Sequence, residues 1–319
     1  MYIPRHLQIE TINGICSSRC IMCTFQTWSR KKNIMSNDTF KQILTKFLTY
    51  RDNIEYLTLH GCGEPLLDKG LPEKIKISKD LGFKGTGFAS NCTHLSKDIS
   101  QKILEAGLDT IIVSIDGINK ETHESIRIGT NYDQILENIK NFIELRNKIG
   151  KTRIIVRFIR QKKNASEFDT FKSYWKERLD SKRGDDILVF DIHNWGEKLN
   201  NFSELHFNKY AIKNSLKCVD VYKRMLIYSN GNVGLCCADD NGFFNLGNVL
   251  EDDPINIYNN QVFSHFREMM DQGRIFELNE CKKCTVPLAR YMKNNMNNNI
   301  PLNITINNLT MKYLPTNIK

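Results

Sequence analysis

Short apolar runs alternate with longer amphipathic stretches from the start of the chain to about residue 195. The first run, over residues 6–12, shows the two-residue alternation of a strand, and the longer stretches have the apolar spacing of a helix face. The pattern predicts six strands, over residues 7–12, 56–60, 85–90, 110–115, 153–159 and 187–192, and helices near 38–50, 69–81, 96–106, 121–149 and 165–179.

Six strand–helix units in succession predict a parallel α/β architecture. After about residue 200 the pattern changes, and turn signals at 229–232 and 241–242 predict a hairpin followed by loops, which indicates a second, smaller unit. The last residues are rich in Asn and are expected to form a loosely packed tail. We therefore expect three segments, 1–200, 201–290 and 291–319.

Composition and charge limit the possible partners. The chain has 319 residues, of which 40% are hydrophobic and 25% charged, and no apolar stretch approaches the ~20 residues that span a bilayer. The first residues lack the apolar core of a signal peptide, so we expect a cytoplasmic protein without membrane contact. The net charge of +9 is interleaved with acidic residues and accompanied by no aromatic–basic motif, so we expect no nucleic-acid partner. A basic patch would instead suit an acidic electron donor such as flavodoxin or ferredoxin.

Three of the ten cysteines lie in a short loop after the first predicted strand. Asn13 and Gly14 end the strand, and Cys16, Cys20 and Cys23 follow with C-x3-C-x2-C spacing. In a βα barrel, chemistry takes place at the carboxyl ends of the strands, which is where this loop belongs. Three thiolates leave one iron of a cubane cluster open to a small molecule. The alternatives are a partial zinc site and ordinary buried thiols.

This motif resembles that of the radical S-adenosylmethionine (SAM) enzymes, and six strand–helix units match the open, partial (β/α)6 barrel of that family. The resemblance implies a [4Fe-4S] cluster that binds SAM and, once reduced, cleaves it to methionine and a 5'-deoxyadenosyl radical. That radical would abstract a hydrogen atom from a substrate in the crevice of the barrel. The expected fold class is therefore α/β, a partial TIM-like barrel with a small C-terminal auxiliary-cluster domain.

The resemblance also implies which residues contact SAM. The family usually has a Gly-Gly-Glu run after the second strand, and here Cys62 replaces its first glycine. We expect Cys62 to offer its backbone carbonyl, Gly63 to allow close approach, Glu64 to receive the SAM ammonium group and Arg127 to pair with the SAM carboxylate. Without the cysteine motif these residues would be a simple turn and a surface charge. The expected SAM contacts are Cys62, Gly63, Glu64, Ser90, Asn91, Ser114 and Arg127.

Three further residues near these motifs have structural interpretations. Asn164 and Glu167 fit a recurring family pattern that we interpret as the N-cap and N3 positions of a helix. Cys92 is expected to be a small buried residue, as free cysteines usually are.

A second set of four cysteines lies in the C-terminal unit. Cys218, Cys236, Cys281 and Cys284 are separated by 18, 45 and 3 residues, and four thiolates complete a cubane cluster. The unit resembles the SPASM domain in its shortened, single-cluster form, the twitch domain of 2-deoxy-scyllo-inosamine dehydrogenase. Cys237 could replace Cys236, but adjacent strand residues point to opposite faces, so we favour Cys236. A structural zinc site is the alternative for this set.

The two expected clusters lead to our functional hypotheses. The first is a SAM-dependent dehydrogenase-like oxidation of a small polar molecule, such as a sugar or aminocyclitol, with the auxiliary cluster as electron acceptor. The second is peptide or protein modification, and the third is a non-catalytic iron–sulfur or zinc protein. A base is needed to remove a hydroxyl proton, but alternation does not show which side of a covered parallel strand faces inward. The candidates are Arg157, Gln161, Asp191 and His193.

Overall fold

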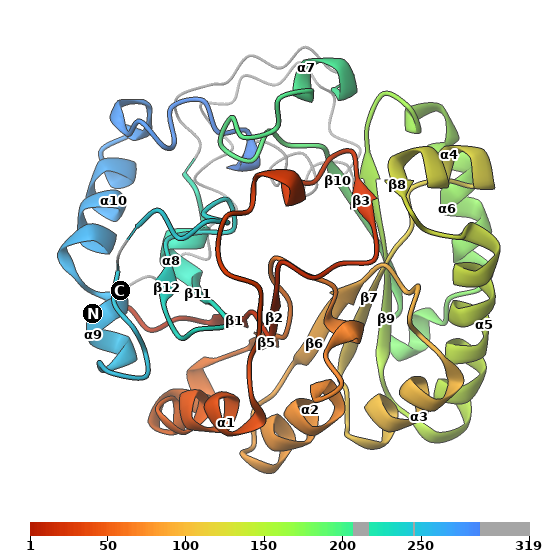
Figure 1. The fold of residues 1–319 in the computed structure, drawn as a ribbon, viewed down its shortest axis with the longest axis horizontal. Coiled ribbons are helices and arrows are strands. Elements are labelled where there is room, and N and C mark those ends of the chain that lie inside the picture. The colour runs from red at the N-terminus through yellow and green to blue at the C-terminus, as the bar shows by residue number, and fades with distance from the viewer. Residues whose placement is uncertain (207–216, 245, 288–319) are drawn as a thin grey trace.

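A computed structural model of the chain describes residues 1–206, 217–244 and 246–287. The expected Asn-rich tail, at 291–319, lies outside the described residues. The described elements form a barrel-like array of strands and helices with a smaller module beside it (Figure 1). No helix in the described ranges is both long and apolar enough to cross a membrane.

All six predicted strands are present, and they form one parallel sheet in sequence order. Each strand pairs in parallel with its neighbour, which confirms the α/β architecture expected from the alternation of elements (Figure 1). The strands are β1 (His6–Ile9), β5 (Tyr56–Thr58), β6 (Thr86–Ser90), β7 (Thr110–Ser114), β9 (Arg153–Arg160) and β10 (Asp186–Asp191).

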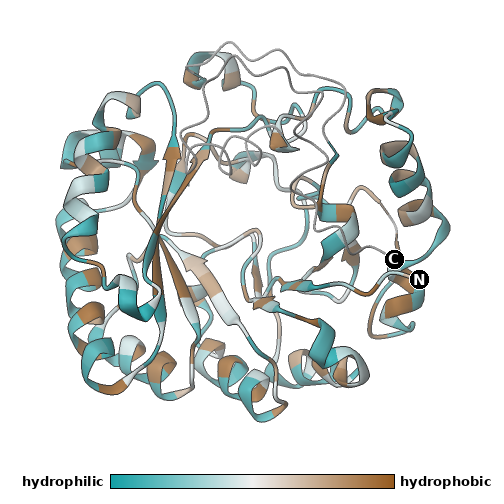
Figure 2. Ribbon diagram, turned by 180° about the vertical axis from the view of Figure 1, so that it is seen from behind, coloured by the Kyte–Doolittle hydropathy of each residue, from teal (hydrophilic) through white to brown (hydrophobic). Residues whose placement is uncertain are grey.

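Helices cover the outer face of this sheet and bury the apolar strand residues against their own apolar sides. Figure 2 shows the largely hydrophobic strands enclosed by helices with mixed hydropathy. Polar N-caps fix several helix starts, such as Ser36, Ser96 and Asn131, each of which accepts a hydrogen bond from the first helical turn. The helices are α1 (Asn37–Thr45), α2 (Leu71–Asp80), α3 (Lys97–Glu105), α4 (Lys120–Ile126), α5 (Tyr132–Ile149) and α6 (Phe168–Lys176).

Two predicted elements are each divided in the structure. The helix expected over 121–149 is wrong as one element, because Gly129 has a φ of +89° and Asn131 starts α5 as a new N-cap. Between α4 and α5 lies β8 (Arg127–Ile128), which pairs antiparallel with β3 (Arg19–Cys20). The strand expected over 7–12 likewise continues as β2 (Ile12–Asn13), which pairs antiparallel with β4 (Asn33–Ile34).

Short 3-10 helices lengthen or precede several α-helices and account for the remaining differences in the predicted bounds. The helix expected near 38–50 ends at Thr45, and a 3-10 segment follows it. The 3-10 helices are η1 (Phe25–Thr27), η2 (Leu48–Asn53), η3 (Pro65–Leu67), η4 (Ala165–Glu167), η5 (Ser181–Arg183) and η6 (Ile275–Glu277).

Asn164 and Glu167 occupy the expected N-cap and N3 positions of a short helix, η4, but their side chains bond elsewhere. The amide of Asn164 donates to the carbonyls of Asp116 and Ile159, and the carboxylate of Glu167 accepts from the backbone N–H of Ile118. No side-chain hydrogen bond caps η4. Both side chains therefore connect the loop after β9 with the loop after β7, which is a structural role other than helix capping.

The smaller module contains the predicted hairpin, and this hairpin extends the barrel sheet. β11 (Arg224–Ile227) pairs antiparallel with β12 (Val233–Gly234) and parallel with β1, so the sheet has eight strands in the order β10-β9-β7-β6-β5-β1-β11-β12. Sequence patterning did not predict this shared sheet. The helices of this part are α7 (Phe202–Leu205), α8 (Asp220–Lys223), α9 (Pro254–Tyr258) and α10 (Gln261–Asp271).

Candidate active site

The three N-terminal cysteines lie together in a loop held by two small strand pairs. The hydroxyl oxygen of Ser18 is 3.5 Å from the sulfur of Cys16 and 3.5 Å from that of Cys20, and the N–H of Cys23 donates to the carbonyl of Cys20. Burial raises the pKa of the Cys23 thiol to about 12. That thiol is therefore protonated at neutral pH unless a bound metal stabilises the thiolate.

Glu64 occupies a closed polar pocket beside this loop. Its side chain accepts hydrogen bonds from the hydroxyl of Ser90 (2.7 Å), the N–H of Asn91 (2.8 Å) and the N–H of Leu66 (3.1 Å). Burial raises the pKa of the Glu64 carboxyl, and these donors oppose the shift. The structure thus brings three of the expected SAM contacts, Glu64, Ser90 and Asn91, to one place.

Asn91 connects that pocket to the cysteine loop. Its side-chain amide donates to the hydroxyls of Ser17 (3.2 Å) and Ser18 (3.3 Å) and lies 3.9 Å from the sulfur of Cys16. The next residue, Cys92, is fully buried as expected and has a φ of +61°, a backbone conformation that favours glycine. This left-handed residue turns the chain away after β6.

Cys62 and Gly63 lie where the chain packs closely against β2. A Cβ atom on Gly63 would be 2.7 Å from the carbonyl oxygen of Ile12, so the position requires glycine. The carbonyl of Cys62 accepts a hydrogen bond of 2.7 Å from the N–H of Gly14, which leaves one lone pair for another donor. A side chain at position 62 is therefore accommodated although the family usually has glycine there.

Arg127 reaches the cysteine loop but is already paired. Its guanidinium forms an ion pair of 2.7 Å with Asp116 and lies 3.6 Å from the sulfur of Cys20. The pairing of β3 with β8 explains this position, since Cys20 and Arg127 are direct partners in the ladder. Asp116 comes directly after β7 and was not among the expected site residues, although its place after a strand was the available signal.

Ser114 and Arg157 face each other on neighbouring strands. They are register partners on β7 and β9, and the guanidinium of Arg157 donates a hydrogen bond of 2.7 Å to the Ser114 hydroxyl. Burial and the charge of Arg127 lower the pKa of Arg157 to about 10, so the side chain remains charged at neutral pH.

The other three candidates for substrate contact have different surroundings. Asp191 forms an ion pair of 2.7 Å with Arg160. His193 packs against the Trp195 ring, and its Nδ1 accepts a hydrogen bond from the N–H of Trp195. Gln161 is fully buried, and neither end of its side-chain amide has a partner among the described residues.

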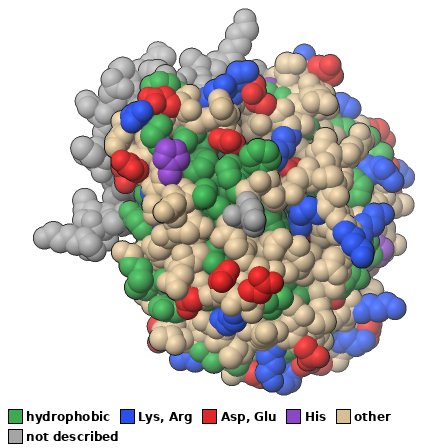
Figure 3. Space-filling model, turned by 60° about the vertical axis from the view of Figure 1, so that its left-hand side comes forward, with side chains coloured by type: hydrophobic (Ala, Val, Ile, Leu, Met, Phe, Trp, Pro, Cys, Tyr) green, Lys and Arg blue, Asp and Glu red, His purple; other side chains and the backbone are tan. Residues whose placement is uncertain are grey.

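The C-terminal cysteines line one cavity of about 300 Å³. Apolar side chains complete its walls, among them Phe244, Phe266 and Met270. Apolar side chains also gather on this side of the molecular surface (Figure 3), and Phe243, which lines the cavity, is 76% exposed. The cysteines of the cavity are Cys218, Cys236, Cys237, Cys281 and Cys284.

The choice of Cys236 over Cys237 as ligand stays a prediction. Both residues line the cavity, because β12 ends at Gly234 and the chain then bends, so strand alternation no longer applies.

In the described ranges, no group of three His, Cys, Asp or Glu side chains is arranged to hold a single metal ion.

Direct hydrogen bonds join the cysteine loop to the cavity. The indole of Trp195, a cavity residue, donates to the carbonyl of Met22 at 2.9 Å, and the hydroxyl of Thr24 donates to Asp240 at 2.6 Å. Met22 and Thr24 flank Cys23 in the sequence. The two cysteine sets are thus held in a fixed relation by residues adjacent to them.

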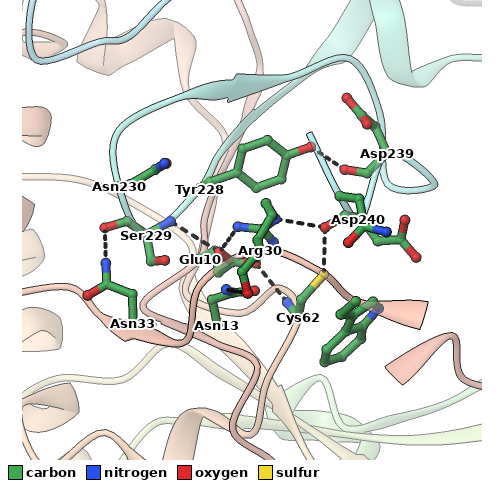
Figure 4. Close-up of polar contacts among 12 residues, drawn as sticks. Glu10, Asn13, Arg30, Asn33, Cys62, Tyr228, Ser229, Asn230, Asp239 and Asp240 are labelled. Atoms are coloured by element: carbon green, nitrogen blue, oxygen red, sulfur yellow. Dashed lines mark hydrogen bonds and ion pairs between the residues drawn. The ribbon is translucent and has the colours of Figure 1, made fainter. Parts of the chain in front are cut away.

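A buried network around Glu10 adds a second connection, drawn in Figure 4. The guanidinium of Arg30 donates two hydrogen bonds to Glu10, at 2.8 and 2.7 Å, and one of 2.8 Å to the carbonyl of Asp240. Glu10 also accepts from the N–H groups of Cys62 and Ser229. Sequence reasoning missed this network, and an acidic residue within the predicted first strand was the only local signal for it.

These residues fit the cofactors that the motifs suggest. The cysteine loop offers three sulfur donors, which suit iron–sulfur clusters, and the buried Glu64 carboxylate suits an ammonium group. The second cavity is lined by more than four sulfur donors in an apolar setting.

Comparison with protein families agrees with this division of the chain. The Radical SAM superfamily matches residues 11–159, and the iron–sulfur cluster-binding domain SPASM matches residues 218–285.

Curated relatives match between half and two thirds of the chain. A probable GTP 3',8-cyclase of Sulfurisphaera tokodaii is 27% identical over 207 residues, which are 65% of this chain and 62% of the relative. A probable GTP 3',8-cyclase of Methanococcus maripaludis is 29% identical over 168 residues, 52% of this chain and 54% of the relative. The chain thus spans between half and two thirds of the length of these relatives.

Solved structures share the fold over most of the chain. BtrN in complex with AdoMet and 2-DOIA superposes with a TM-score of 0.61 at 18% identity, over 88% of this chain and 93% of BtrN. Streptococcus suis SuiB bound to S-adenosylmethionine has a TM-score of 0.64 at 15% identity, over 84% of this chain and 68% of SuiB. The structure of anSMEcpe with AdoMet and the Cp18Cys peptide has a TM-score of 0.62 at 14% identity, over 90% of this chain and 88% of anSMEcpe.

Fold, cysteine sites and matched domains together define the class of this protein. The chain contains a Radical SAM domain, over residues 11–159, and a C-terminal SPASM domain, over residues 218–285. SAM and iron–sulfur clusters are its cofactors, one cluster serving the radical SAM domain and further iron–sulfur binding belonging to the SPASM domain.

Proposed function

We propose that this enzyme abstracts a hydrogen atom from a small polar substrate and completes a two-electron, dehydrogenase-like oxidation. The observation that carries the proposal is the direct attachment of the second cysteine cavity to the first cysteine loop, through Trp195–Met22 and Thr24–Asp240. An electron acceptor held at a fixed position near the substrate site is what an oxidation requires after hydrogen abstraction.

The proposed assignment of cofactor-holding residues follows from the geometry. Cys16, Cys20 and Cys23 would hold the first [4Fe-4S] cluster, which supplies the electron for SAM cleavage and so for the 5'-deoxyadenosyl radical. For the second cluster we keep Cys236 as ligand, with Cys237 as the alternative in the same cavity. The proposed ligands of that cluster are Cys218, Cys236, Cys281 and Cys284.

The residues around Glu64 would orient SAM. The Glu64 carboxylate is held by donors from three residues, so it cannot turn away from the position it has in the pocket. Its negative charge would attract the SAM ammonium group, while the close packing at Gly63 lets the backbone approach the ligand. Correct placement of a bound reactant contributes much of the rate of such a step. The proposed SAM contacts remain Cys62, Gly63, Glu64, Ser90, Asn91, Ser114 and Arg127.

A small-molecule substrate is supported by the match to BtrN. The chain covers 93% of BtrN, whose solved complex contains AdoMet and 2-DOIA, and 68% of SuiB. We infer from this a substrate of the sugar or aminocyclitol type and an acidic protein, such as a flavodoxin or ferredoxin, as electron donor.

Measurement of iron, acid-labile sulfide and zinc per chain tests the proposal. After anaerobic reconstitution we expect about eight irons and eight sulfides, no stoichiometric zinc, and SAM-dependent release of 5'-deoxyadenosine on reduction. Deuterated sugars and aminocyclitols would then be screened for transfer of deuterium into 5'-deoxyadenosine. About four irons with one zinc would contradict the oxidation, because the internal electron acceptor would be missing.

Peptide modification is the second candidate, favoured by specific neighbours. SuiB has been solved with its precursor peptide SuiA, and anSMEcpe with the Cp18Cys peptide. The curated relatives named as probable GTP 3',8-cyclases add GTP to the substrates worth testing. Deuterium transfer from a labelled peptide or from GTP, with none from sugars, would favour one of these functions over the first.

A further inference from the structure

Asp116 holds the guanidinium of Arg127 against the first cysteine loop. The ion pair between Nη2 of Arg127 and Oδ2 of Asp116 is 2.7 Å long, and the two side chains are 6% and 0% exposed. The other terminal nitrogen of Arg127, Nη1, donates to the sulfur of Cys20 at 3.6 Å. One guanidinium thus connects a buried carboxylate with a sulfur atom of the C-x3-C-x2-C motif.

Asp116 is itself fixed through its side chain and its backbone. Its Oδ1 accepts a hydrogen bond of 2.6 Å from the N–H of Ile159, and its carbonyl accepts one of 3.0 Å from the amide of Asn164. Its N–H donates to Nδ1 of His123 at 3.3 Å. Because these contacts come from β9, from the loop after β9 and from α4, the carboxylate that pairs with Arg127 is held from several sides.

The backbone places Arg127 beside Cys20, but it does not fix the direction of the long side chain. The two residues are register partners in the ladder of β3 and β8. The charge of Arg127 also acts on Glu64, so a second carboxylate is within electrostatic reach of the guanidinium. The ion pair with Asp116 therefore selects the orientation in which the guanidinium meets the sulfur.

Ser18 gives the same sulfur a neutral donor. Its hydroxyl oxygen is 3.5 Å from the sulfur of Cys20 and 3.5 Å from that of Cys16, and it accepts a hydrogen bond of 3.3 Å from the amide of Asn91. Because the oxygen accepts from Asn91, the single hydroxyl proton remains for one of the sulfurs. Ser18 is thus an internal reference, which contacts Cys20 without bringing a charge.

A positive charge beside a cluster ligand acts on the reduction potential. The potentials of iron–sulfur clusters depend on net charge and on hydrogen bonds to the sulfurs. Reduction adds a negative charge to a cluster, so a fixed guanidinium stabilises the reduced form and raises the potential. The guanidinium of Arg127 keeps its charge at every physiological pH.

We propose that Asp116 is a positioning residue that directs Arg127 to Cys20 and thereby raises the reduction potential of the cluster held by the first cysteine loop. The inference rests on the proposed function in one respect, because it takes Cys20 as a ligand of that cluster. It gives Arg127 a role that precedes the proposed contact with the SAM carboxylate. The potential governs how completely a given electron donor reduces the cluster.

An EPR-monitored reduction titration of the anaerobically reconstituted full chain, without SAM, tests the proposal. A parallel series with SAM identifies the signal of the first cluster, because SAM binds to that cluster. The variants are R127Q, R127K, D116N, the double variant D116N/R127Q, and S18A. The matched control is D185N, which breaks another buried Arg–Asp pair at the amino end of β10, away from the cysteine loop.

R127Q should lower the potential by about 59 mV, which is a tenfold loss in the equilibrium constant of a one-electron reduction. S18A removes only a neutral donor from the same sulfur, so it should lower the potential less. R127K keeps the charge without the planar donors and should lie between R127Q and the wild type. D185N should leave the potential unchanged, whatever its effect on stability.

The sign of the change in D116N separates positioning from a direct effect of charge. If Asp116 acts by holding Arg127, D116N should lower the potential toward the value of R127Q, and the double variant should match R127Q. If Asp116 acted only through its own negative charge, D116N would raise the potential, because less negative charge would oppose reduction. A rise in D116N therefore refutes the positioning role.

Failure of this inference is distinguishable from failure of the proposed function. A wild-type potential in R127Q, at wild-type iron content, refutes the role of Arg127 and leaves the proposed function untouched. If R127Q assembles no cluster, equal potentials in R127K, S18A and the wild type refute it instead. If the wild type itself assembles no cluster in the first cysteine loop, the proposed function fails, and this inference fails with it.

Discussion

The guanidinium of Arg30 lies between the carboxylate of Glu10 and the backbone carbonyl of Asp240 and donates hydrogen bonds to both (Figure 4). Glu10 follows the first barrel strand, and Asp240 follows the two adjacent cysteines of the SPASM domain. The ring of Tyr228, also from that domain, stacks on the guanidinium at 4.0 Å. One side chain therefore connects the SAM-binding part of the barrel to the second cysteine cavity.

Substitution of Arg30 should weaken this connection strongly. The Glu10 side chain is 1% exposed, so R30Q leaves a buried carboxylate without its partner and should destabilise the protein by about 3–5 kcal/mol. R30K keeps the charge but lacks the paired donors and the stacking, so it should lower the free energy of unfolding less than R30Q does. Urea unfolding and the EPR signal of the second cluster would measure the two effects.

Arg5 provides the matched control for that experiment. It pairs with Glu55 at an exposed position, where both side chains are more than 40% accessible, so R5Q should cost less than about 1 kcal/mol. Equal losses in R5Q and R30Q would contradict a special role for the Glu10 network.

Removal of single cysteines should separate the two clusters. Replacing Cys218, Cys281 or Cys284 by alanine should lower the iron content from about eight to about four per chain and leave SAM cleavage intact in the first site. C236A and C237A, made side by side, would identify which of the adjacent residues is a ligand. C92A is the control, because Cys92 belongs to neither expected ligand set and its buried thiol donates to the backbone carbonyl of Ser90. Loss of iron in C92A would contradict this assignment.

The buried ion pair between Arg146 and Asp185 should be a major stability determinant of the barrel. Both side chains are 0% exposed, and they form paired hydrogen bonds of 2.9 and 2.7 Å that join α5 to the start of β10. D185N leaves the guanidinium unpaired and should lower the free energy of unfolding by about 3–5 kcal/mol. Thermal and urea unfolding would measure it, with D186N as control, since Asp186 is 65% exposed. A loss in D185N no larger than in D186N would refute the prediction.

Acid should destabilise the protein through His123. Burial and the nearby Arg127 lower the pKa of His123 from 6.5 to about 3, so the folded protein excludes a proton that the unfolded chain binds below pH 6.5. The contribution of His123 to the free energy of unfolding is therefore fully present above pH 6.5 and declines as the pH falls. H123Q should reduce the pH dependence of unfolding between about pH 7.5 and 5.5 by up to about 1.4 kcal/mol per pH unit. An unchanged slope in H123Q, or an equal change in the exposed control H265Q, would argue against this origin.

The sequence predicted the strands and the cysteine sites because both depend on local patterns. The core strands are nearly continuous apolar runs, and Cys16, Cys20 and Cys23 are so close in sequence that one loop must bring them together. The helix over 121–149 was wrong because its periodicity continues across Gly129, and only the left-handed backbone there shows the break.

Contacts between distant segments could not be predicted in this way. The ladder between β1 and β11 joins His6 to Arg224, and nothing near either residue specifies the other. The same holds for the Arg30–Asp240 contact, whose residues are ordinary charged side chains when considered singly.

The parallel pairing of β11 with β1 has a consequence for the way this enzyme can be divided. β1 is an interior strand, with β5 on one side and β11 on the other. Cutting the chain between the two domains would leave those backbone N–H and C=O groups of His6–Ile9 that face β11 without partners along a new edge, and such edges promote aggregation. We therefore expect the barrel and the SPASM domain to unfold as one cooperative unit, and neither to be a module that can be exchanged alone.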